Sequence, residues 1–134
     1  MKSKHQPLLV FSLAAVLGAL ICLLSPWLAG HREPWDAQSH YYVCALLIAG
    51  FLPACLSTGS FILSALGVWF GQTATVLFAF VLFTQPRNGP DNGLWMVGLA
   101  SLFFQLGPAV AGAFLGEAAH IGFRRLRSHA SKVA

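Results

Sequence analysis

The segment FILSALGVWFGQTATVLFAFVLF, residues 61 to 83, decides the fold class of this chain. It contains no Asp, Glu, Lys or Arg. It is also longer than the about 20 apolar residues that a helix needs to cross the hydrocarbon core of a bilayer. Because backbone groups in lipid must form hydrogen bonds within the segment, we expect a helix here. The segment therefore predicts an integral membrane protein.

Three further apolar runs surround this segment, at residues 8–29, 41–56 and 94–119. The first and the last are long enough to span a bilayer. The middle run is short and contains Pro53 near its end. No run alternates apolar and polar residues as the strands of a membrane barrel do. We therefore expect an all-α integral membrane protein, in which residues 1–134 form one four-helix transmembrane bundle with a basic tail at 120–134.

The first run is longer than the apolar core of a secretory signal peptide, which favours a retained span. Composition supports a membrane protein, because 57% of the 134 residues are hydrophobic and 9% are charged. Soluble domains contain about 25% charged residues. The cysteines are odd in number and lack paired spacing, so we expect them to act as small apolar side chains rather than as a disulfide framework. These residues are Cys22, Cys44 and Cys55.

The net charge of +4 comes from basic residues at the two ends of the chain. They are Lys2, Lys4, Arg124, Arg125, Arg127 and Lys132. The loop after the first run carries Arg32, offset by Glu33 and Asp36, and the loop after the third carries Arg87, offset by Asp91. The positive-inside rule therefore predicts that both termini lie in the cytoplasm. The small size and sparse tails favour a bacterial inner membrane. The sequence does not indicate a soluble module with a basic, base-reading face, so we expect no nucleic-acid binding.

The loop HREPWDAQSH, residues 31 to 40, holds two of the four acidic residues of the chain. We consider it a candidate partner or gating loop, through His31, Arg32, Glu33, Trp35, Asp36 and His40. The alternative is a capping and anchoring loop, in which Pro34 stops one helix and Asp36 or Ser39 caps the next. The spacing of its histidines and carboxylates matches no standard metal site, so we expect no metal and no cofactor.

Polar residues inside the runs are few and uncharged. Their lack of charge argues against proton-coupled or ion-coupled transport. Gln72 and Gln105 fall at similar depth near the bilayer centre, and Pro108 frees the carbonyl of Phe104 one turn from Gln105. We predict that the glutamines bond to each other or to that carbonyl. The alternative is a solute path that they line together with Thr73.

Glycines spaced four residues apart mark candidate helix contacts. Gly67 and Gly71 form one such pair, and Gly112 and Gly116 form another. This spacing lets helix backbones approach closely. The pattern leaves open whether each pair faces its own bundle or another chain.

A Glu-x-x-His pair, Glu117 and His120, has the spacing found in carboxylate-bridged metal sites. Such sites need a second pair, which the chain lacks, so we expect an interfacial helix end. The sequence shows no arrangement of a nucleophile with its base and no phosphate-binding loop. We therefore predict no catalytic residues and no enzymatic activity.

We therefore expect a small non-enzymatic accessory or scaffold subunit, in contact with lipid and with another membrane protein. The alternative is a homo-oligomeric channel or transporter for an ion or small solute, because four helices this small can hardly enclose a path alone.

Overall fold

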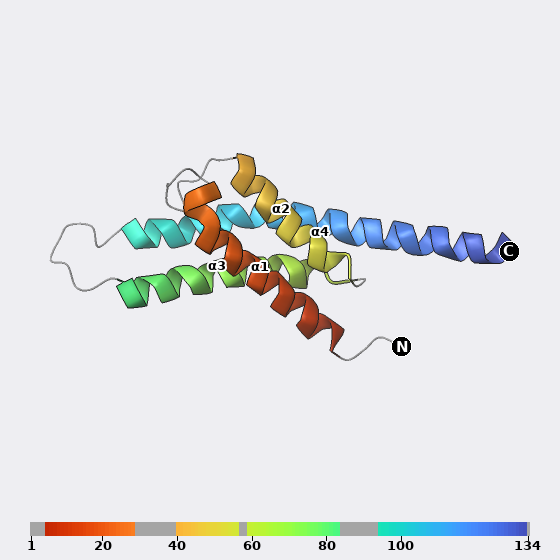
Figure 1. Ribbon diagram of the computed structural model, residues 1–134, viewed down its shortest axis with the longest axis horizontal. Helices are drawn as coiled ribbons and strands as arrows, with labels where there is room; N and C mark the ends of the chain where they lie inside the picture. The colour runs from red at the N-terminus through yellow and green to blue at the C-terminus, as the bar shows by residue number, and fades with distance from the viewer. Residues whose placement is uncertain (1–4, 29–39, 57–58, 84–93, 134) are drawn as a thin grey trace.

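The computed structural model describes residues 5–28, 40–56, 59–83 and 94–133. Every regular element in this part of the chain is an α-helix (Figure 1). The helices are α1 (Gln6–Leu28), α2 (His40–Ala54), α3 (Phe61–Phe83) and α4 (Leu94–Val133). The predicted helical fold is confirmed for the described residues. Three helices, α1, α3 and α4, are long and apolar enough to cross a membrane, and α2 is shorter.

The ends of α1, α2 and α3 fall within two residues of the apolar runs. The fourth helix differs, because it does not stop near residue 119 but continues to Val133, for 40 residues in total. Residues 120–133 contain no proline and include three arginines and one lysine, which are good helix formers. At about 1.5 Å per residue, α4 is about 60 Å long, roughly twice the thickness of the hydrocarbon core.

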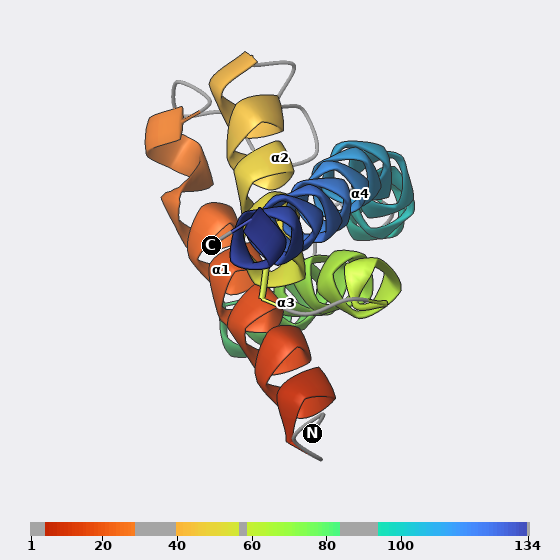
Figure 2. The same cartoon turned by 90° about the vertical axis from the view of Figure 1, so that its right-hand side faces the viewer.

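The helices pack in two closely associated pairs, α1 with α3 and α2 with α4, which are joined through contacts between α3 and α4. In Figure 1, α1 begins, α4 ends and the chain passes from α2 to α3 at the same end of the bundle. Figure 2 views the bundle from that end, where the last turns of α4 extend toward the viewer. This arrangement is that of a chain that runs back and forth four times.

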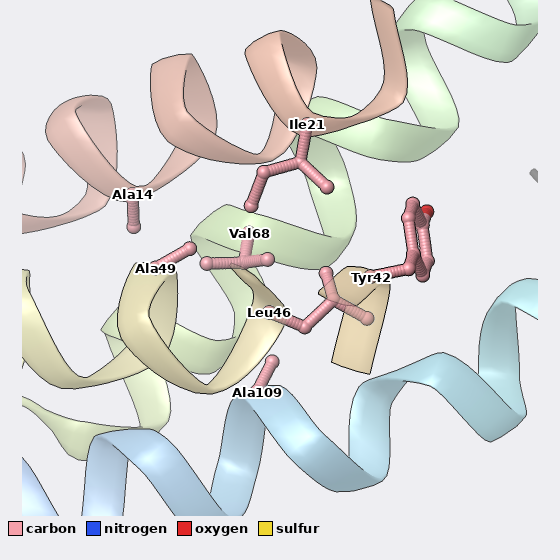
Figure 3. Close-up of a cluster of buried hydrophobic side chains, with 7 residues drawn as sticks. All are labelled: Ala14, Ile21, Tyr42, Leu46, Ala49, Val68 and Ala109. Atoms are coloured by element: carbon pink, nitrogen blue, oxygen red, sulfur yellow. The ribbon is translucent and has the colours of Figure 1, made fainter. Parts of the chain in front are cut away.

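The core of the bundle is built mainly from small and medium side chains (Figure 3). They are Ala14, Ile21, Tyr42, Leu46, Ala49, Val68 and Ala109. Several phenylalanines lie outside instead, with exposed fractions of 86% at Phe104 and 66% at Phe78. In water this surface would be an exposed apolar patch, whereas lipid chains solvate it without cost.

The paired glycines lie where helices cross. A Cβ atom built on Gly67 would lie 2.7 Å from both Ala14 Cβ and Phe11 O of α1, and one on Gly71 would meet the carbonyl of Ala15. On α4, a Cβ atom on Gly112 or Gly116 would meet the backbone of α2. Both glycine pairs therefore face helices of their own bundle.

Candidate functional site

A cluster of three polar side chains lies between α2, α3 and α4. Gln72 Nε2 donates a hydrogen bond to Tyr42 Oη at 2.7 Å. Tyr42 Oη in turn donates to Gln105 Oε1 at 3.0 Å, and Gln72 Nε2 also lies 3.4 Å from that oxygen. Tyr42 and Gln72 are each 1% exposed. The three side chains form a closed ring of hydrogen bonds that joins three helices.

The position of Tyr42 was not anticipated from the sequence. Two tyrosines at the start of an apolar run, Tyr41 and Tyr42, are typical of an aromatic belt at a membrane surface. That interpretation is wrong for Tyr42, which points into the core beside Leu46 (Figure 3), whereas Tyr41 is 76% exposed. Consecutive helical residues point about 100° apart, so Tyr41 can face outward while Tyr42 faces the core. The signal was present, because Tyr42, Leu46 and Ala49 share one helix face.

Thr73 follows Gln72 but takes no part in the ring. Its Oγ1 atom is buried and has no hydrogen-bond partner within the described residues, and Trp69 Nε1 is in the same situation. The Trp69 ring packs against Phe103 of α4, with centroids 5.2 Å apart. By contrast, Thr75 donates to the carbonyl of Gly71 at 2.8 Å. Two donors without a partner therefore lie on α3 beside the hydrogen-bonded ring of Tyr42, Gln72 and Gln105.

Glu117 of α4 caps the start of α3. The backbone N–H groups of Gly59 and Phe61 donate to its two carboxylate oxygens, at 2.6 and 3.1 Å. Gly59 has a φ of 75°, a left-handed conformation that glycine adopts readily. The carboxylate thus satisfies N–H groups that a helix start leaves free, and it lies at the positive end of the helix dipole.

His120, one turn after Glu117, contacts the end of α2. Its Nδ1 atom lies 2.6 Å from the carbonyl oxygen of Cys55, so a proton on Nδ1 makes it the donor. Cys55 Sγ donates in turn to the carbonyl of Gly116 at 3.4 Å. We call Glu117 and His120 the hairpin clamp, because they bind the backbone on both sides of the α2–α3 connection.

The hairpin clamp gives the Glu-x-x-His pair a structural role that the sequence did not suggest. The described residues contain no group of three or more His, Cys, Asp or Glu side chains that could hold a metal ion. Residues 31–39 of the candidate partner loop lie outside the described residues. His40 is exposed and begins α2.

The fold and the polar ring define a small helical protein whose outer surface suits a membrane. No family model, curated protein or solved structure matches the chain.

Proposed function

We propose that this chain is a non-enzymatic accessory or scaffold subunit of a membrane complex in a bacterial inner membrane. One observation carries the proposal: three polar side chains, Tyr42, Gln72 and Gln105, bind one another across α2, α3 and α4. Such bonds hold helices together at about 0.6 to 2 kcal/mol each. An interior used in this way serves the fold rather than a substrate.

The placement of charge supports the same proposal. Coupled transporters and proton relays use ionisable side chains within the membrane. In this chain the long apolar segments contain none at mid-span, and Glu117 near the end of the fourth run caps α3. Groups for proton or ion coupling are thus lacking where such a mechanism would need them.

We further propose four spans with both termini in the cytoplasm. The basic residues at both chain ends support this orientation, as does the shared end of the bundle at which α1 begins and α4 ends. The 15 residues of α2 measure about 22 Å, less than the about 30 Å of the hydrocarbon core. Local thinning of the bilayer would accommodate the shorter helix.

The partner would be another membrane protein, contacted through the loop of residues 31–40. The experiment is to extract the full chain from its host in native nanodiscs and to measure the mass of the complex. We expect a foreign chain in fixed stoichiometry. A complex built only from copies of this chain would contradict the accessory role.

Two loops of similar charge provide a matched pair of variants. Arg32→Ala with Glu33→Ala should release the foreign chain, because it removes two of the three charged side chains from the proposed contact. Arg87→Ala with Asp91→Ala removes the same charges from the other loop and should leave the complex intact. Equal loss from both variants would show that the 31–40 loop is not the specific contact.

The second candidate is a homo-oligomeric channel or transporter for an ion or small solute. It is favoured by Thr73 Oγ1 and Trp69 Nε1, two buried polar atoms that have no hydrogen-bond partner within the described residues. If this candidate is correct, proteoliposomes that contain the protein should show solute flux. The double variant Gln72→Leu with Gln105→Leu should abolish that flux. Wild-type flux in the folded variant would remove the glutamines from any path.

A further inference from the structure

The last turns of α4 extend beyond the hairpin clamp and away from the other helices (Figure 1). Residues 121–129 are all exposed. Among them are large apolar side chains, with exposed fractions of 73% at Phe123 and 68% at Leu126. This segment packs against little of its own bundle. Contacts within the bundle therefore do not account for its large apolar side chains.

The segment is basic and has no acidic residue to neutralise it. Arg124, Arg125 and Arg127 lie within one turn, and the sequence contains no Asp or Glu after Glu117. Glu117 itself already accepts two backbone hydrogen bonds at the start of α3. The negative charge that balances these arginines must therefore come from outside the segment.

Cations and apolar groups occupy neighbouring stripes of this helix. Arg124 and Arg127 follow His120 at four and seven residues, so they extend the helix face that carries the hairpin clamp. Phe123 and Leu126 are three residues apart and share the adjacent face. A pair of guanidinium groups beside an apolar stripe matches a phospholipid, whose phosphate lies next to its acyl chains.

The depth of the arginines agrees with this match. We place the hairpin clamp at the inner edge of the hydrocarbon core. Measured from Glu117 along α4, Arg124 then lies about 10 Å beyond that edge and Arg127 about 15 Å beyond it. The headgroup layer adds about 5 to 8 Å on each side. Helix tilt and the length of the arginine side chains, which reach back toward the interface, bring both guanidinium groups to the phosphate level.

We propose that Arg124 and Arg127, flanked by Phe123 and Leu126, bind the phosphate of an anionic phospholipid of the adjoining leaflet. The complementary charge of the lipid replaces the acidic residues that the segment lacks. Binding fixes the depth at which α4 leaves the membrane. The proposal does not depend on the accessory role of the bundle.

The test uses the full chain in phosphatidylcholine vesicles that contain spin-labelled phosphatidylglycerol or spin-labelled phosphatidylcholine. Electron paramagnetic resonance measures the fraction of each label that the protein immobilises. We expect the wild type to prefer phosphatidylglycerol several-fold. Arg124→Gln with Arg127→Gln should lower that preference to near one, since a single cation near an anionic surface contributes about 1 kcal/mol, or roughly fivefold.

The matched control is Arg125→Gln with Lys132→Gln, which removes the same charge from a different helix face and should retain most of the preference. Equal loss in the two variants would overturn the proposal in favour of diffuse surface charge. A wild type that shows no preference for phosphatidylglycerol would also overturn the proposal. An acidic segment of a partner protein would then be the ligand of this surface. Far-UV circular dichroism checks that every variant remains folded.

Discussion

At the scale of single residues, Tyr42 holds the interior polar ring together. Its hydroxyl accepts from Gln72 and donates to Gln105, so one side chain links two glutamines on different helices. The direct contact between the glutamines is longer, at 3.4 Å. In a bilayer core no water replaces such bonds, and a polar group left unpaired is costly.

Replacing Tyr42 with phenylalanine should therefore destabilise the bundle. Tyr42→Phe removes both short hydrogen bonds and leaves the buried Gln72 amide with its 3.4 Å contact to the half-buried Gln105. We expect a loss of about 1 to 2 kcal/mol in the free energy of unfolding, measured by steric trapping in bicelles. The control is Tyr41→Phe, whose exposed hydroxyl should contribute little; equal losses would contradict the role of the ring.

At the scale of helices, close crossings depend on glycine. A Cβ atom on Gly112 would meet the Leu47 carbonyl oxygen and lie 2.8 Å from its carbonyl carbon, whereas one on Gly107 has no atom within 4 Å. Gly112→Ala should cost about 1 to 3 kcal/mol, because α2 and α4 must separate. Gly107→Ala should be neutral or stabilising by up to about 1 kcal/mol. Thermal unfolding in detergent compares the two variants, and similar midpoints would argue against close packing at Gly112.

The hairpin clamp also belongs to the scale of helices. Glu117→Ala removes the acceptors of the Gly59 and Phe61 N–H groups, so the first turn of α3 should open more often. We expect a loss of about 0.5 to 2 kcal/mol, typical of a lost helix cap. Amide hydrogen exchange at residues 59 and 61 measures this loss and should be faster in the alanine variant. Glu117→Gln keeps one carbonyl acceptor and should fall between the wild type and alanine; unchanged exchange in the alanine variant would contradict the cap.

At the scale of the whole molecule, the bundle ends at the hairpin clamp while α4 continues beyond it. A chain truncated after Gly122 should unfold at the wild-type temperature, because the lost residues through His129 are exposed. A chain truncated after Gly116 loses Glu117 and His120 and should be less stable. Circular dichroism on heating measures both, and equal destabilisation would show that the last turns support the bundle.

Composition along the chain predicted the positions of α1, α2 and α3 and a surface suited to a membrane, but not the continuation of α4 to Val133. Both depend on local composition: an apolar run of sufficient length forms a helix in lipid wherever it occurs. The shared depth of Gln72 and Gln105 also followed from counting residues along neighbouring spans. The glycine spacing of α3 and α4 indicated close approach, although it did not identify the helices that approach.

Only the tertiary structure decided the partner of each helix and the face that it presents. Tyr42 joins the glutamines, and Glu117 reaches Gly59, through contacts between residues 30 to 63 positions apart. Sequence spacing within one helix says which residues share a face, but the rotation of that helix against its neighbours depends on packing all four together. The hydrophobic pattern gives little guidance here, because in lipid both the inner and the outer faces of a helix are apolar.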